Sequence, residues 1–407
     1  MRNELAEEFL CRFGVRPQAG ARAPGRVNLI GEHTDYNEGR VLPCAIDRDA
    51  HALVALRADA RVRVFSRELG AAECDAARLR RSGGFVDGVQ GVVAALARRG
   101  IAPRGFDLAI ASEVPIGAGL SSSAALGVAV ATVLDAAQGT GLDARERAAI
   151  AHEAEVEFVG VPCGVMDPLA SALGRAGEAL YIDCRSGAIE AVALPPLALL
   201  VADSGVRRRL AAGAYGDRRG ECLRALAAAR AAGVAPPGAT ALRDLAPSDL
   251  PALERALDPL LFRRARHVIA ENARVAACVA ALRAGDLAAA GACLREGMRS
   301  LRLDFDVSVA ELDALCEIAD AVPGVHGSRL TGAGFGGCTL HLVAPERADA
   351  VALAIAAGFE RRFGRRPPLW RLRASAGATS EPPAGALANV PKSPPRAPDR
   401  SQGPSRS

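Results

Sequence analysis

The chain has 407 residues, half of them hydrophobic and 24% charged, a composition typical of a soluble globular protein with room for two domains. Its net charge of +4 is spread over Arg residues that alternate with Asp and Glu, which argues against a nucleic-acid partner. No apolar run is long enough to span a membrane, and the first residues lack the apolar core of a secretion signal. We therefore expect a cytoplasmic protein with reduced cysteines.

Lysine is nearly absent from the sequence. Lys392 is the only Lys among 50 basic residues, and it lies in a Pro-rich segment. Walker-type phosphate loops, protein kinases and Schiff-base enzymes all depend on a buried Lys, so the sequence argues against these classes. If the protein handles phosphate, it must use backbone amides, Arg and a metal ion. The ten Cys residues include no CxxC pair, so we expect neither a zinc site nor an iron–sulfur cluster.

Apolar periodicity predicts alternating helices and strands along the chain. The expected helices are, in chain order, 1–13, 86–98, 121–137, 145–157, 215–232, 261–284, 286–301 and 308–321. The expected strands are 49–57, 61–65, 106–111, 180–183, 199–203 and 339–343. Two such rounds predict an α+β protein with domains at 1–195 and 196–376. A Pro/Ser/Arg-rich segment over 377–407 lacks a periodic apolar pattern, which predicts a disordered tail.

The first motif is GRVNLIGEHTDYN, at residues 25–37. A strand-like apolar piece over 27–30 ends at a Gly, and three polar side chains, Glu32, His33 and Asp35, follow at once. Carboxylates and an imidazole crowded onto one loop can accept hydrogen bonds from several vicinal hydroxyls of a sugar. For an anonymous loop of this kind a solvated turn with a capping Asp would be the alternative.

The second motif is PIGAGLSSSAA, at residues 115–125, between the expected strand 106–111 and the expected helix 121–137. Gly residues let a backbone turn its N–H groups toward a ligand, and the N-terminus of a helix adds partial positive charge. The two features together predict an anion site that needs no Lys, with Ser hydroxyls available to phosphate or Mg²⁺. The alternative is a helix capped by Ser with a flexible lead-in.

Two further segments are rich in Gly. GSRLTGAGFGGC, at 327–338, implies an unusual tight backbone, and it is not a Rossmann fingerprint because a strand follows it. The GxGxG pattern alone could be a mere turn. GVPCGVMD, at 160–167, ends in a lone carboxylate, Asp167, in an apolar stretch. A buried Asp is costly unless it is paired, which favours a functional role, although it could also cap a helix over 169–173.

These motifs, in this order and spacing, resemble those of the GHMP small-molecule kinases, and GRVNLIGEHTDYN resembles the galactokinase signature within that family. The string IDCRS at 182–186 fits as well, and the resemblance runs from about residue 23 to residue 343. It implies two α+β domains with the active site in the cleft between them. It also implies transfer of phosphate from ATP, with Mg²⁺, to the C1 hydroxyl of D-galactose, the first step of galactose catabolism.

The resemblance also implies roles for individual residues. Asp167 matches the catalytic Asp of the family and Arg26 its partner. The positions that match sugar-binding residues are Glu32, His33, Asp35, Gly164 and Tyr215. The positions that match the ATP phosphate loop are Gly117, Ala118, Gly119, Leu120, Ser121, Ser122 and Ser123. The third motif contributes Thr331, Gly332, Gly334 and Gly336. The expected Mg²⁺ ligands are Ser123 and Glu155, with Ser122 as an alternative.

The sequence departs from the family pattern without losing a catalytic residue. Pro168 replaces a usual Gln, Arg208 a His and Ala333 a Gly, while Ser82 and Phe85 stand where the family places Trp and Tyr near adenine. Two alternatives remain: a kinase for another sugar, such as N-acetylgalactosamine or arabinose, or a non-catalytic sugar sensor. Sensors of this family lose small residues from the Ser-rich loop, which is intact here. We expect a monomer whose partners are the sugar and ATP.

Overall fold

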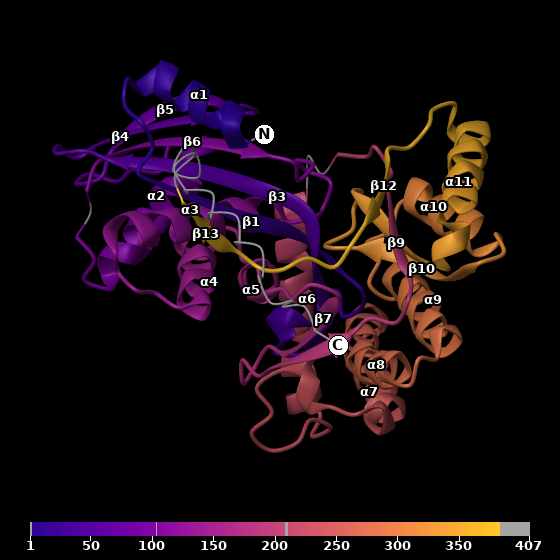
Figure 1. Ribbon diagram of the computed structural model, residues 1–407. Helices are drawn as coiled ribbons and strands as arrows, with labels where there is room; N and C mark the ends of the chain where they lie inside the picture. Colours follow the sequence, from indigo (N-terminus) through magenta and orange to yellow (C-terminus); the bar gives the residue numbers. More distant parts are fainter. Residues whose placement is uncertain (1, 103, 208–210, 383–407) are drawn as a thin grey trace, which may run out of the picture.

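The computed structural model describes residues 2–102, 104–207 and 211–382 (Figure 1). The α-helices in these ranges are α1 (Arg2–Phe13), α2 (Val86–Arg98), α3 (Ser122–Gln138), α4 (Ala144–Glu153), α5 (Met166–Leu173), α6 (Ala211–Ala231), α7 (Leu250–Ala256), α8 (Pro259–Arg283), α9 (Leu287–Leu303), α10 (Ala310–Asp320) and α11 (Ala348–Phe363). The strands are β1 (Ala19–Asn28), β2 (Arg40–Val41), β3 (Pro43–Leu56), β4 (Arg61–Ser66), β5 (Gly70–Asp75), β6 (Phe106–Ser112), β7 (Glu178–Asp183), β8 (Ile189–Ala193), β9 (Ala198–Asp203), β10 (Val325–Thr331), β11 (Cys338–Val343), β12 (Leu369–Leu372) and β13 (Thr379–Glu381).

A six-stranded sheet, in the order β13-β1-β3-β6-β4-β5, organises the first half of the chain. Helix α1 packs Leu5 and Phe9 against one face of this sheet. The largest apolar core lies on the other face, where α3 and α5 contact β1 and β3. Strand β1 therefore lies in the middle of the packed structure, and its end can hold a functional side chain rigidly.

A four-stranded antiparallel sheet, in the order β10-β11-β9-β12, belongs to the second half of the chain. Helices α10 and α11 pack on it, and α6, α8 and α9 form a further helical core. A small sheet, β2-β7-β8, packs beside α5 and α8. Figure 1 shows the two larger sheets on opposite sides of the molecule, which confirms the expected α+β class. Among the residues described, no helix combines the length and the apolarity needed to cross a membrane.

The two halves of the chain separate between β8 and β9, which belong to different sheets. We therefore keep 195/196 as the proposed domain boundary. The prediction of a disordered tail from residue 377 was wrong at its start, because β13 pairs antiparallel with β1, in the register Ala21 to Ser380. This strand is polar and has no apolar alternation, so its stability comes from backbone pairing with β1, which a sequence pattern does not show. The remainder of the predicted tail, 383–407, lies outside the described residues.

Truncation should separate these two parts of the predicted tail. Removing residues 377–407 deletes β13 and the buried Ala378, whereas removing 383–407 leaves both in place. With about 1 kcal/mol for each net hydrogen bond, we expect the longer truncation to lower the free energy of unfolding by about 2 kcal/mol. Chemical denaturation of the two truncated proteins measures the difference. Equal stabilities would mean that β13 contributes nothing to the sheet.

Candidate active site

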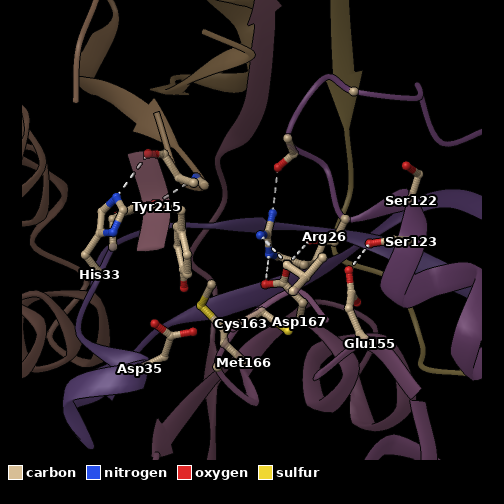
Figure 2. Close-up of a pocket in the computed structure, with 18 residues that line it drawn as sticks. Arg26, His33, Asp35, Ser122, Ser123, Glu155, Cys163, Met166, Asp167 and Tyr215 are labelled. Carbon is tan, nitrogen blue, oxygen red and sulfur yellow. Dashed lines mark hydrogen bonds and ion pairs between the residues drawn. The ribbon is translucent and has the colours of Figure 1, made fainter. Parts of the chain in front are cut away.

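A bidentate ion pair lies at the centre of the site (Figure 2). Nε and Nη2 of Arg26, near the end of β1, each donate to one carboxylate oxygen of Asp167 at 2.7 Å. The third arm of the guanidinium, Nη1, donates to the carbonyl of Gly119 at 2.7 Å. Asp167 lies in the first turn of α5 and also accepts from the Ser121 hydroxyl. Arg26 is almost completely buried. Its three bonds therefore fix this carboxylate against the Gly-rich loop, the part of the second motif that contains Gly117 and Gly119.

The Gly-rich loop joins β6 to α3, as the sequence predicted. Gly117 and Gly119 have positive φ, and Ser121 is left-handed as well, at φ 60°. Gly25 is required for close approach, because a Cβ there would lie 2.7 Å from the carbonyl oxygen of Leu120. The Ser121 side chain does not cap α3, so the alternative of a Ser-capped helix is wrong and the first amides of α3 remain open to an anion.

Ser123 and Glu155 lie together, as the proposed Mg²⁺ ligands should. The Ser123 hydroxyl donates to a carboxylate oxygen of Glu155 at 2.9 Å, and Glu155 lies on the turn Ala154–Val159 that follows α4. Burial raises the pKa of Glu155, an effect that a bound cation would reverse. Figure 2 shows the Ser122 hydroxyl turned away from this carboxylate, so the structure favours Ser123 over the alternative.

The donor set fits Mg²⁺ only if phosphate oxygens complete it. In the described ranges, no group of three or more His, Cys, Asp or Glu side chains could hold a metal ion by itself. Mg²⁺ prefers hard oxygen ligands and is typically held by one or two carboxylates together with substrate phosphates. A carboxylate and a hydroxyl beside a phosphate loop match that preference.

The sugar motif, residues 32–35 of the first motif, forms the opposite wall of the site. His33 has φ 64°, and its ring is fixed at both nitrogens. Nε2 faces the carbonyl oxygen of Ala333 at 3.0 Å, so Nε2 carries the proton, and Nδ1 accepts from the Tyr36 hydroxyl at 2.8 Å. The Tyr215 ring, from α6, lies 5.5 Å from the His33 ring. The two halves of the chain thus meet at this imidazole.

Asp35 packs directly on Gly164. A Cβ at residue 164 would lie only 2.0 Å from the Asp35 carboxylate, so any larger residue at this position would displace the Asp35 side chain. Burial raises the pKa of Asp35 to about 6, and the nearby charge of Asp167 adds to the shift. Asp35 is therefore mostly ionised at neutral pH and can accept hydrogen bonds from sugar hydroxyls.

The third motif reaches the site with only part of its length. Gly332 and Ala333 line the cavity, whereas Thr331 bonds to the backbone of Asn28 and so links β10 to β1. Gly334 and Gly336 lie behind the cavity. A Cβ at either position would lie within 2.4 Å of a backbone carbonyl oxygen, that of Val307 or Val206. These two glycines allow close packing rather than ligand contact.

A cavity of about 390 Å³ collects the predicted residues from both halves of the chain. The predicted residues that line it are Arg26, Glu32, His33, Asp35, Gly117, Gly119, Ser121, Ser122, Ser123, Glu155, Gly164, Asp167, Tyr215 and Gly332. Ala118 and Leu120 are buried behind the loop and do not line it. The sequence reasoning missed Val161, Cys163 and Met166 as lining residues, although they lie within the GVPCGVMD motif.

A second cavity of about 250 Å³ adjoins the first and shares Ser122, Ser123 and Glu155 with it. Its other walls are largely apolar and include Phe85, one of the departures from the family pattern. Ser82, the other departure, bonds through its amide and its hydroxyl to Asp87 and so fixes the adjoining loop. An apolar slot beside a phosphate loop fits a planar nucleobase.

Arg207 is a second arginine at the Gly-rich loop that sequence reasoning did not single out. It pairs with Asp203 at 2.9 Å, and its side chain passes 3.9 Å from the position of a Cβ on Gly117. The signal was available in the string 203–207, DSGVR. Of the remaining departures, Pro168 is buried in α5 and does not line the cavity, and Arg208 lies outside the described residues.

The fold, the open helix N-terminus and the paired cavities define a small-molecule kinase of the GHMP type. Family models match at residues 7–56 (galactokinase galactose-binding signature), 87–175 (GHMP kinases N terminal domain) and 278–361 (GHMP kinases C terminal). The galactokinase of Roseiflexus sp. (strain RS-1) is 45% identical over 377 residues, which are 92% of this chain and 96% of that protein. The galactokinase of Chloroflexus aurantiacus is 46% identical over 358 residues, 87% and 91% of the two chains. The chain therefore belongs to the galactokinase family, and it is an enzyme that acts as a sugar kinase.

Solved structures agree with this assignment. The crystal structure of Lactococcus lactis galactokinase complexed with galactose is similar, with a TM-score of 0.88, 32% identity, and coverage of 92% of this chain and 98% of that one. The Methanococcus jannaschii mevalonate kinase, at 16% identity and a TM-score of 0.64, covers 88% and 98% of the two chains and shares the fold.

Substitution at Gly164 tests the packing of Asp35. In Gly164→Ala the new methyl group would displace the Asp35 carboxylate. A displacement of about 1 Å in an active site can lower the rate by about 10²-fold. We expect kcat/KM for the sugar to fall by roughly that factor while KM for ATP changes little. Gly220→Ala, on α6 with only the flexible Arg224 side chain at 3.5 Å, is the matched control. Normal sugar kinetics in Gly164→Ala would refute the proposed role of Asp35.

Proposed function

We propose that the protein transfers the γ-phosphate of ATP to the C1 hydroxyl of D-galactose, giving galactose 1-phosphate and ADP. One observation carries the proposal: Arg26 holds the Asp167 carboxylate against the Gly-rich loop, in the cavity that His33 and Asp35 also line. The galactose-binding signature over 7–56 and the relatives at 45% identity support galactose as the sugar. In a cell the reaction would start galactose catabolism. We also propose that the enzyme acts as a monomer in the cytoplasm.

Orientation of the sugar is the first contribution of this chain to the reaction. We assign Glu32, His33, Asp35, Gly164 and Tyr215 to sugar binding, since all five line the cavity. Carboxylates accept hydrogen bonds from hydroxyls, and neighbouring residues fix their positions before the sugar arrives. Holding two reactants in line can supply several kcal/mol of the barrier reduction. The C1 hydroxyl would then face Asp167.

Proton acceptance and charge stabilisation are the second contribution. Phosphoryl transfer passes through a loose transition state whose charge lies mainly on the phosphoryl oxygens. The amides of residues 117–123 and the N-terminus of α3 stabilise this charge without any Lys. Ser123 and Glu155 would hold Mg²⁺, which would supply further neutralisation of the phosphate charge. Asp167 accepts the proton of the sugar hydroxyl, while Arg26 holds the carboxylate in place.

Product identification tests the proposed function directly. We expect ³¹P and ¹H NMR of a mixture of the protein, galactose, ATP and Mg²⁺ to show galactose phosphorylated at C1. A panel that also contains N-acetylgalactosamine and arabinose separates galactose from the alternative sugars. Binding of galactose and ATP without any phosphate ester would instead support a non-catalytic sugar sensor.

Asp167→Asn tests the general base. The amide keeps the shape of the side chain but cannot accept a proton, so we expect kcat to fall roughly 10²–10⁴-fold. Arg26→Lys should also be damaging, because a point charge does not replace a planar fork that bonds to three acceptors. Steady-state kinetics and galactose binding of each variant provide the measurement. Near-normal turnover of Asp167→Asn would mean that this carboxylate is structural.

Glu155→Gln tests the metal ligand. The neutral amide is a weaker ligand for a hard cation, so we expect the Mg²⁺ concentration for half-maximal rate to rise roughly 10–100-fold. Glu157→Gln is the matched control, because Glu157 lies on the same turn and pairs with Arg98 at the surface. If Glu155→Gln and the control respond alike to Mg²⁺, Glu155 is not a ligand.

A further inference from the structure

A buried group of four charged side chains lies behind the sugar motif. The Arg329 guanidinium, from β10, is fully buried and contacts the carboxylates of Glu32 and Glu271. Glu271, on α8, also accepts from Nε of Arg274 at 2.7 Å. Two acidic and two basic side chains therefore lie together, with Arg274 only partly buried and the other three fully buried. Buried charges are strongly unfavourable unless such partners surround them.

This group ties three segments of the chain to one point. Glu271 accepts the Gly31 amide at 3.0 Å, and Glu32 accepts the Gly332 amide at 3.3 Å. Nε2 of His267, on α8, donates to the Glu32 carbonyl at 3.1 Å. Only Glu32 among the acidic and basic members lines the cavity, so it is the member that can contact a ligand.

The neighbouring helix leaves room for the guanidinium. A Cβ added to Gly297, on α9, would lie only 2.7 Å from Nη1 of Arg329. A larger residue at this position would therefore displace the arginine side chain. The Arg329 guanidinium is thus held by Glu32, by Glu271 of α8 and by the adjacent backbone of α9 at Gly297. A rigidly placed cation beside a carboxylate determines where that carboxylate points.

We infer that Arg329 is a positioning residue for the sugar site, which holds the Glu32 carboxylate at the cavity wall in balance with Glu271. This inference rests on the proposed function, because it assumes that Glu32 contacts the sugar. It assigns to the arginine of the third motif a role at the sugar rather than at the nucleotide. The two glutamates then have different tasks: Glu271 anchors the arginine, and Glu32 accepts a hydrogen bond from a sugar hydroxyl.

The electrostatics of the group separate the two glutamates. Burial raises the pKa of Glu32 to about 7, with Arg329 opposing and Glu271 adding to the rise. Burial also opposes ionisation of Glu271, but Arg329 and Arg274 outweigh it and lower its pKa. His267 stays neutral, since burial lowers its pKa to about 4. Glu32 is therefore the titrating member of the group, and sugar affinity should fall as the pH drops through its pKa, because the neutral carboxylic acid is a weaker acceptor than the carboxylate.

Two variants should move this titration in opposite directions. The acidic limb is the part of the pH profile of kcat/KM for galactose in which the rate falls as the pH drops. Arg329→Met removes the cation that favours ionised Glu32, so this limb should shift to higher pH. Glu271→Gln removes a like charge but keeps an oxygen for the Gly31 amide, so the limb should shift to lower pH. Glu32→Gln removes the Glu32 component of the limb and leaves the Asp35 component at lower pH, so the difference from wild type identifies the part that belongs to Glu32. We expect galactose KM to rise at least tenfold in Arg329→Met at pH 7, with ATP KM within about twofold of wild type.

The matched control is Arg283→Gln. Arg283 lies on α8, as Glu271 does, and forms an exposed ion pair with Glu190, so its loss should leave galactose KM and the acidic limb unchanged. If Arg329→Met does not fold, as thermal melting will show, Glu271→Gln still tests the inference. Unshifted limbs, shifts in the same direction, or equal increases in galactose KM and ATP KM would overturn it, because lost packing alone predicts these results.

Calorimetric titration with galactose over the same pH range separates this inference from the proposed function, since it needs no turnover. A wild-type protein that binds galactose but forms no phosphate ester refutes the function alone, and the opposite shifts in affinity still test Arg329. A wild-type protein that does not bind galactose overturns both.

Discussion

The bidentate pair between Arg26 and Asp167 is the interaction on which the rest of the site depends. The residues that the structure describes include no Lys, and here one guanidinium holds both the carboxylate and the Gly-rich loop. Arg can do this because its planar fork offers several donors with fixed directions. The pair also explains the local backbone: Gly25 lets β1 approach the loop, and Ser121 turns away from α3 to bond to Asp167.

Much of the fold could be predicted from periodicity, because long amphipathic or buried segments carry a strong pattern. The helix expected over 121–137 is α3, and the strand expected over 199–203 is β9. Strands that have no apolar alternation and are stabilised by backbone pairing were missed. Strand β10 has a largely polar sequence and pairs with β11, and β13 pairs with the distant β1. The helix expected over 145–157 ends at Glu153. A short π-helical turn, Ala154–Val159, follows it and carries Glu155.

Most of the residues that line the candidate cavity could be named from the sequence, because they lie in long local motifs. Sequence alone could not show how these motifs meet. The contact between the His33 ring and Ala333 joins residues 300 positions apart, and Arg329 of β10 is buried in contact with Glu32 and with Glu271 of α8. Gly334 and Gly336 were expected at the site, but their role is close packing, which a Gly pattern cannot distinguish from ligand contact.

A crystal structure with galactose and a non-hydrolysable ATP analogue tests the central claim most directly. The claim is that one arginine-held carboxylate faces the reacting hydroxyl while the Gly-rich loop holds the triphosphate. The account predicts the C1 hydroxyl within hydrogen-bonding distance of Asp167 and the γ-phosphate beside residues 117–123. A sugar bound with C1 directed away from Asp167, or a triphosphate bound outside the Gly-rich loop, would contradict it.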